Sequence, residues 1–161
     1  MRFSTREDIA LPIDVVFKEM TNFDAMERRA LRRGADVNRS DPPTGPGKGS
    51  TWEIAFSFRG RRRECHSEVT GFDAPNAMVV ASQVGGISGH LTLEFIVLNP
   101  KKTRVKTAID LKPNTLSARL LIQSLKLAKS SLEKRFKSGI ANFARQMEDD
   151  HRGTRPGDTL A

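Results

Sequence analysis

Tyrosine is absent from this 161-residue sequence, and cysteine and tryptophan each occur only once. Because Cys65 cannot form an internal disulfide, the composition suits a reducing compartment, and we expect a cytoplasmic protein. The lack of tyrosine removes one common acid or hydrogen-bond donor from any catalytic site. Three histidines and one cysteine show no metal-ligand spacing, so we expect neither a metal nor a cofactor.

The sequence also has little that could cross a membrane. Its first residues are charged and contain no apolar core of the kind a signal peptide needs. The longest uncharged run extends from Ala74 to Leu93, but it contains a proline and three glycines. These residues exclude a spanning helix in lipid, so we expect a soluble protein.

The composition is that of a globular protein, with 37% apolar residues, 29% charged residues and a net charge of +8. The length predicts one domain over residues 1–150, followed by a disordered tail over 151–161. A basic surface favours nucleic acid, anionic lipid or an acidic partner. Aromatic residues do not alternate with the basic runs as base-stacking platforms would, which makes nucleic acid an unfavoured partner.

The first third of the chain predicts a strand and two short helices. Apolar residues alternate with polar ones from Phe3 to Leu11, which indicates a strand. Pro12 suits the first turn of a helix, and Asn22 or Asp24 could cap a second one that stops at Gly34. Residues 41–49 carry three prolines and three glycines and predict an irregular loop.

After this loop the hydrophobic period changes to two. Alternation and turn residues predict strands over 51–58, 64–72, 77–84, 91–97 and 105–111. Short turns join them, which indicates an antiparallel meander without helical crossovers. The first of these strands places Trp52 and its apolar neighbours on one face and Glu53 on the other.

The C-terminal third predicts one long helix from Asn114 or Thr115 to about Asp149. Apolar residues recur there every three or four positions, which keeps them on one face. A straight helix of that length would reach roughly 50 Å, longer than a small domain is wide. We therefore expect an overhanging end, or a bend near Ser130-Ser131 or Gly139.

This order of elements resembles the SRPBCC superfamily, which includes the START-like proteins and the polyketide cyclases. The resemblance rests on Ile9–Phe17, on the turn Gly47–Ser50 and on the strand and turn Val69–Pro75. It implies an α+β helix-grip fold, in which a curved antiparallel sheet of six to seven strands wraps a long C-terminal helix. Many members carry a tryptophan at the end of the second short helix. Here that region is the basic segment Glu27–Arg33, so we expect a basic cavity mouth.

The resemblance implies three functions, which the residues leave open. The first is a protein that binds a small hydrophobic or amphipathic ligand in a cavity between the sheet and the C-terminal helix. The second is an enzyme of the polyketide cyclase/dehydratase type, with no catalytic residue assigned. The third is a protein-interaction module like the chaperone-ATPase activators that share this fold.

The candidate ligand-binding residues are the apolar faces of the central strands, one polar residue on the last strand and the buried stripe of the C-terminal helix. They are Trp52, Ile54, Phe56, Phe58, Leu93, Phe95, Thr107, Ile109, Leu125, Leu132 and Phe136. The alternative is that these residues form a solid core. Gly139 on the helix stripe would leave space beneath the helix and favours a cavity.

Two other motifs resemble functional sites but lack features that those sites need. The segment 45–51 resembles a phosphate-binding loop, but its lysine is followed by glycine and it leads into a strand. Cys65 and His66 are neighbours on a strand, so their side chains point to opposite faces and cannot form a nucleophile pair. We expect Cys65 inside and His66 outside, beside Glu64 and Glu68.

The start of the C-terminal helix carries a second apolar stripe, formed by Leu116, Leu120 and Leu127. A helix that buries one face on a sheet has no intramolecular use for two. This stripe could contact a homodimer partner, a lid loop or a membrane surface. The alternative is that the loop 41–49 folds over it.

Overall fold

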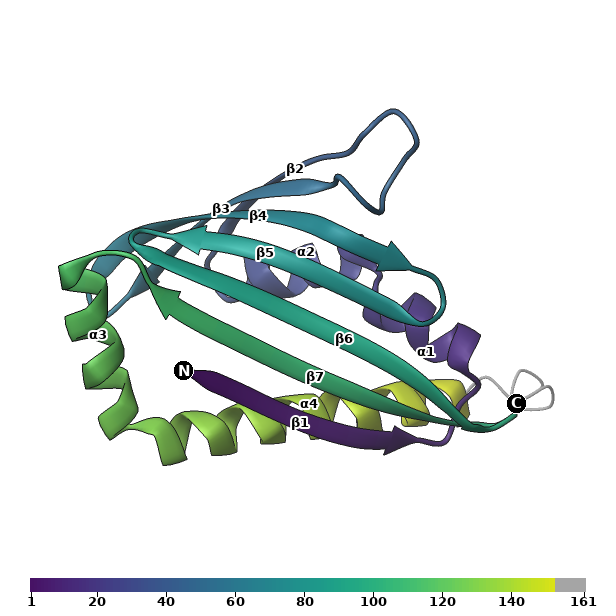
Figure 1. The fold of residues 1–161 in the computed structure, drawn as a ribbon. Helices are drawn as coiled ribbons and strands as arrows, with labels where there is room; N and C mark the ends of the chain where they lie inside the picture. Colours follow the sequence, from purple (N-terminus) through teal and green to yellow (C-terminus); the bar gives the residue numbers. More distant parts are fainter. Residues whose placement is uncertain (153–161) are drawn as a thin grey trace.

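The computed structural model describes residues 1–152, and within them the chain forms one seven-stranded antiparallel sheet and four helices (Figure 1). Residues 153–161, most of the expected disordered tail, lie outside the described residues. The strands are β1 (Arg2–Ile9), β2 (Asp36–Ser40), β3 (Thr51–Phe58), β4 (Arg61–Asp73), β5 (Ala77–Val84), β6 (Ile87–Asn99) and β7 (Lys102–Pro113). The helices are α1 (Ile13–Met20), α2 (Phe23–Arg32), α3 (Leu116–Leu127) and α4 (Lys129–Arg152).

The sheet is a meander from β2 to β7, and β1 is added beside β7 at the far edge. Short connections make this order possible, because neighbouring strands run in opposite directions. Between β3 and β4 the turn has only two residues, Arg59 and Gly60, and both have positive φ angles of 50° and 73°. Two such residues form the turn that matches the twist of a hairpin. The expected α+β helix-grip architecture is thus confirmed, with β2 as a strand that the sequence had not indicated.

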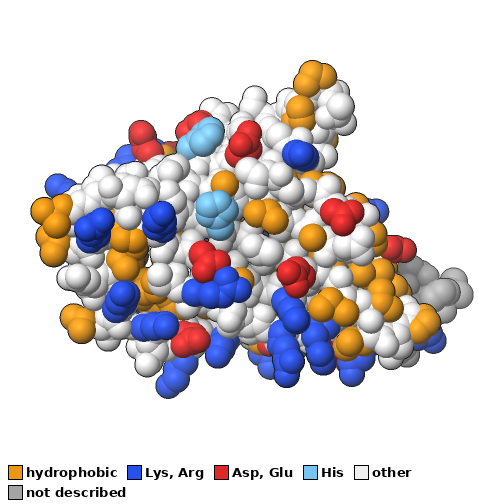
Figure 2. Space-filling model, in the orientation of Figure 1, with side chains coloured by type: hydrophobic (Ala, Val, Ile, Leu, Met, Phe, Trp, Pro, Cys, Tyr) orange, Lys and Arg blue, Asp and Glu red, His pale blue; other side chains and the backbone are white. Residues whose placement is uncertain are grey.

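The helices lie on one side of the curved sheet and leave the other side open. In Figure 1, α1 and α2 lie behind the sheet and α4 runs along β1. Figure 2 shows the open side from the same direction, with charged and polar side chains spread over it. No helix within residues 1–152 is long and apolar enough to cross a membrane.

The two short helices begin as the sequence predicts. Pro12 precedes the first turn of α1, and Asn22 caps α2 by accepting a hydrogen bond of 3.1 Å from the Ala25 N–H. This cap satisfies one of the backbone donors that a helix N-terminus leaves unpaired.

The C-terminal helix is divided, whereas the sequence predicted a single helix. Thr115 caps α3, as expected, by accepting from the Ala118 N–H at 3.1 Å. At Ala128 the backbone leaves helical geometry, and its N–H bonds to Leu125 within the last turn of α3. The chain then turns into α4, so that α3 covers the end of the sheet while α4 follows β1 (Figure 1). A straight helix could not cover both surfaces, and the bend lies close to the expected Ser130-Ser131.

The solid core fills one half of the space between the sheet and the helices. It contains side chains from α1, α2, the end of α4 and the central strands. The largest fully buried ones include Ile9, Met78 and Val105, each at most 1% exposed. Gly139 is exposed on α4, so the expectation that it lies on the buried stripe is wrong. The half of the sheet near α3 is packed less completely.

Candidate functional site

A cavity of about 510 Å³ lies between α3 and the end of the sheet. Its walls come from the β3–β4 hairpin, the β5–β6 turn, the end of β7 and the inner face of α3. The lining residues are Phe56, Phe58, Arg61, Arg63, Val84, Gly85, Gly86, Ile87, Leu111, Ser117, Ala118, Leu121 and Leu125. Ligand cavities are typically about 300–1,000 Å³ in volume and mostly apolar, and this one fits both criteria.

Strand register explains why these side chains meet. Phe56 pairs with Arg63 across the β3–β4 hairpin, and Phe58 pairs with Arg61. Directly opposite residues in an antiparallel pair point to the same face, so all four share the concave face with Ile54. The cavity floor therefore combines aromatic rings with two guanidinium groups.

The rim of the cavity is tied to α3. Arg59 in the hairpin turn donates a hydrogen bond of 3.1 Å from Nη1 to Ser124 Oγ. On the opposite side, Gly86 lies under the first turn of α3, and a Cβ there would sit 2.3 Å from Thr115 Oγ1. The Gly86 carbonyl also accepts a 2.7 Å bond from the Asn114 N–H. Only a glycine permits this approach, which brings the helix over the cavity.

A second cavity of about 410 Å³ lies between α2 and β3, and Phe56 belongs to both. The smaller one is lined by Met26, Arg29, Ala30, Arg33, Ala35, Ile54 and Phe56. Arg29 stacks over Phe143 of α4, with its guanidinium carbon 4.1 Å from the ring centroid. Burial lowers the pKa of Arg29 from its usual value. These arginines supply the basic surroundings that the sequence of α2 led us to expect.

Three of the predicted ligand-binding residues belong to the solid core. Trp52, Leu93 and Phe95 are 7%, 5% and 4% exposed. Trp52 packs edge-on against Phe23 at 4.9 Å between ring centroids, and its indole N–H donates a 3.0 Å hydrogen bond to Glu27. None of the three lines either of these cavities.

Of the other predicted residues, some line one of the two cavities and the rest lie outside both. The structure brings Phe56, Phe58 and Leu125 together in the larger cavity, and Ile54 lines the smaller one. The half-buried residues Ile109, Leu132 and Phe136 line neither, and Phe136 lies 6.3 Å from Phe3 between ring centroids. Thr107 is 2% exposed, and its hydroxyl finds no hydrogen-bond partner among the described residues.

Sequence reasoning missed several residues of the larger cavity. Arg61, Arg63 and Leu121 line it but were not among the predicted ligand-binding residues. The alternation of β4 carried the signal for the arginines, because inward-facing Val69 and Cys65 place Arg63 and Arg61 on the same face.

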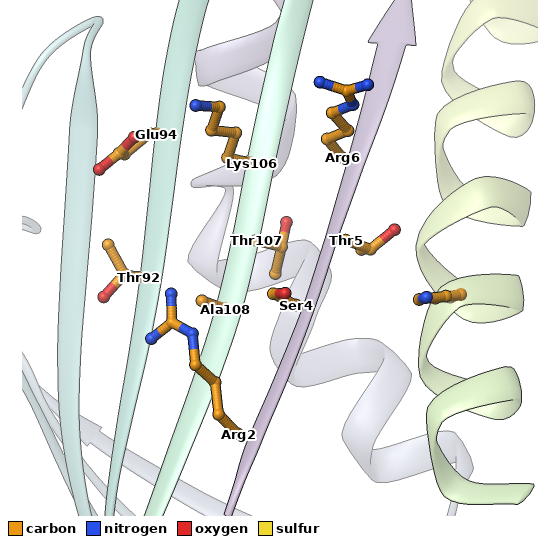
Figure 3. Close-up of a pocket in the computed structure, with 10 residues that line it drawn as sticks. Arg2, Ser4, Thr5, Arg6, Thr92, Glu94, Lys106, Thr107 and Ala108 are labelled. Atoms are coloured by element: carbon orange, nitrogen blue, oxygen red, sulfur yellow. The ribbon is translucent and has the colours of Figure 1, made fainter. Parts of the chain in front are cut away.

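A depression of about 650 Å³ lies on the outer face of the sheet at the β1 edge (Figure 3). It is lined by Arg2, Ser4, Thr5, Arg6, Thr92, Glu94, Lys106, Thr107, Ala108 and Lys137. Its charges are partly neutralised, since Arg2 pairs with Asp110 at 2.5 Å and Lys106 lies opposite Glu94 in the strand register. The groove is lined mainly by charged and polar side chains, which suit a hydrophobic ligand less well than the cavity beneath α3.

Cys65 and His66 face opposite sides of β4, as expected. Cys65 is buried on the concave face, with Sγ 3.4 Å from Ser67 Oγ, and it does not line the larger cavity. His66 lies outside and bonds to Glu53 across the β3–β4 pair. Neither Cys65 nor His66 therefore lines the larger cavity.

Comparisons with known proteins bear on the fold. No family model and no curated protein matches the chain. Among solved structures, a norcoclaurine synthase point mutant of Thalictrum flavum in complex with a transition-state analogue superposes with a TM-score of 0.67 at 12% identity, covering 94% of this chain and 96% of that one. A START superfamily protein of Mycobacterium smegmatis gives 0.55 at 13% identity, covering 83% and 95%.

A third similar structure is an HSP90 activator of Plasmodium falciparum, with a TM-score of 0.50 at 20% identity over 71% of this chain and 76% of that one. At these identities the likeness concerns the fold, which hosts different activities. The resemblance predicted from the sequence is confirmed at the level of the fold: the chain has the helix-grip fold of these solved structures.

Proposed function

We propose that the protein binds a small hydrophobic or amphipathic ligand in the cavity beneath α3. The observation that carries this proposal is the 510 Å³ space walled mainly by half-buried apolar side chains on the concave side of the sheet. Such a space in a closely packed protein is the usual binding site for a small molecule. The plant enzyme with the same fold holds a transition-state analogue, so the fold can accommodate an organic ligand.

We propose binding without catalysis. A cyclase or dehydratase needs an acid or base within hydrogen-bond reach of the reacting atoms. Among the described residues, the cavity lining contains no aspartate, glutamate, histidine or cysteine. Its charged groups are arginines, which stay protonated and do not exchange protons near neutral pH.

A neutral fluorescent hydrophobe, N-phenylnaphthylamine, tests the proposal directly. Leu121→Trp should fill the cavity, because Leu121 lines it from α3. Leu127→Trp is the matched control, since Leu127 lies on the same helix but is 92% exposed. We expect the wild type and Leu127→Trp to bind the probe with a one-to-one stoichiometry and Leu121→Trp to bind it much more weakly. Equal binding by all three proteins, or none by the wild type, would contradict the proposal.

The outer face of α3 supports a second role. Leu116, Leu120 and Leu127 are 75%, 60% and 92% exposed, so the second apolar stripe is uncovered. The alternative in which the loop 41–49 covers it is wrong, because this loop packs at the other end of the sheet, with Gly47 against Phe72 (Figure 1).

We propose that this stripe contacts an anionic membrane surface. Arg119 and Lys126 flank the leucines on α3, and basic side chains beside exposed leucines suit anionic lipid. A homodimer through the same face would bring the equivalent arginines and lysines of two copies together, which is unfavourable.

Leu120→Lys tests this surface, with Leu98→Lys as a control at an exposed leucine on β6. We expect co-sedimentation with phosphatidylglycerol vesicles to fall for Leu120→Lys alone, and wild-type binding to be weak with phosphatidylcholine. A monomer-to-dimer change in gel filtration caused by Leu120→Lys would refute the membrane assignment, as would vesicle binding that the substitution leaves unchanged.

A further inference from the structure

Two arginines of the β3–β4 hairpin line the larger cavity, and of these Arg63 is half-buried and Arg61 is exposed. Arg61 and Arg63 are two positions apart on β4, so they share the concave face. Their cross-strand partners are Phe58 and Phe56, which also line the cavity. Arg62 between them points the other way and pairs with Asp36 at 2.5 Å.

The charge of this pair is not neutralised by the protein. The cavity lining contains no carboxylate, and neither Arg61 nor Arg63 forms an ion pair with a described residue. The Nε of Arg63 is buried and has no hydrogen-bond acceptor within residues 1–152. A buried donor without an acceptor is costly, so Arg63 offers an N–H group that an acceptor on a bound molecule would satisfy. The guanidinium carbon of Arg63 lies 5.8 Å from the Phe58 ring centroid, which leaves its N–H edge available.

The rest of the cavity is apolar and suits a hydrocarbon body. Leu121 and Leu125 form its roof on α3, and Ile87 and Leu111 form the wall opposite the hairpin. A guanidinium binds a carboxylate or phosphate through two parallel hydrogen bonds, and this interaction is stronger where water is excluded. A ligand with an amine would be repelled by the same two arginines.

We propose that the cavity beneath α3 binds an amphipathic acid: an apolar body within the cavity, with one carboxylate or phosphate group held by Arg63 and Arg61. This inference rests on the proposed function, because it specifies the ligand of the same cavity. It identifies the hairpin arginines as the groups that select the ligand.

Three ligands with the same ten-carbon chain test it: decanoic acid, monodecyl phosphate and decanol, each used below its micelle-forming concentration. Isothermal titration calorimetry at pH 7 compares the wild type with Arg63→Gln. Arg62→Gln is the matched control, since it removes the same charge from the neighbouring position on the outer face.

We expect at least one of the two acids to bind the wild type about tenfold or more tightly than decanol, because a charge-assisted hydrogen bond contributes about that much affinity. Arg63→Gln should remove most of this preference and leave decanol binding nearly unchanged, while Arg62→Gln keeps the preference. Whichever of the two acids binds more tightly identifies the acid group of the ligand as a carboxylate or a phosphate.

Different binding results would contradict the acid ligand and the hydrophobic cavity. Equal wild-type affinity for all three ligands would refute the acid group and leave the cavity as a hydrophobic site. An equal effect of Arg62→Gln and Arg63→Gln would also refute it, because overall charge would then explain the preference. If no decyl ligand binds to the wild type, the proposed function itself is wrong.

Discussion

Two leucine truncations test whether one half of the fold is solid and the other hollow. Leu93 on β6 is 5% exposed and belongs to the core, where it neighbours Met78 and Thr107 in the strand register. Leu121 on α3 is half-buried and borders the larger cavity. The change to alanine removes the same atoms at both positions, so any difference in the loss of stability comes from how closely each position is packed.

The two positions differ in the expected loss of stability. Leu93→Ala removes about 2.4 kcal/mol of hydrophobic burial at roughly 0.8 kcal/mol per side-chain carbon. The cavity left in a closely packed site brings the total to about 3–5 kcal/mol. Leu121→Ala should lose about 1.5–2.2 kcal/mol of burial and add little cavity cost, because it widens a space that already exists.

Thermal unfolding followed by circular dichroism measures this difference. A loss of about 4 kcal/mol lowers the midpoint by roughly 8–16 °C in a protein of this size, and a loss of about 2 kcal/mol lowers it by roughly 4–8 °C. Urea unfolding provides the free energies independently. Equal losses of about 3 kcal/mol or more at both positions would show that the end beneath α3 is packed solid, and would refute the cavity.

Two further predictions concern the support of α3 and the edge of the sheet. Gly86→Ala should displace the capping threonine, lower stability by about 1 kcal/mol and weaken probe binding in the cavity; unchanged binding and stability would contradict the role of this turn. A hydrogen bond from Arg104 lowers the pKa of Asp8 from its usual value of 3.8. The stability that Asp8 adds is therefore present above that value and lost as the pH falls through the lowered pKa. In urea unfolding, Asp8→Asn should have a lower free energy of unfolding than the wild type at pH 6, and this difference should disappear near pH 2. A difference that stays constant with pH would exclude the Asp8–Arg104 pair as its source.

Much of the fold could be predicted from local pattern. Period-two alternation identified the strands from β3 to β7, and the caps at Asn22 and Thr115 identified the starts of α2 and α3. These signals are local, because a strand face or a helix cap depends on residues a few positions apart. The short strand β2 was missed because its five residues, Asp36–Ser40, are mostly polar and it forms an edge.

The candidate site was predicted only in part. The pattern placed Phe56, Phe58 and Trp52 on one face correctly, since a strand has a fixed period. It could not separate Trp52, which α2 covers with Phe23, from Phe56, which faces open space. That difference depends on which helix lies over each position, and helix packing joins residues far apart in the chain.

The sequence by itself determined most of the elements, their faces and the antiparallel order, because hydrophobic period and turn chemistry act over short distances. The tertiary structure decided where the space between the sheet and the helices is left open as a cavity. The turn at Ala128 directs α3 over the end of the sheet and α4 along β1, so a single predicted helix covers two surfaces and leaves space beneath the first. The β3–β4 register then places Arg63 inside that space, unpaired and opposite Phe56, because cross-strand partners share a face.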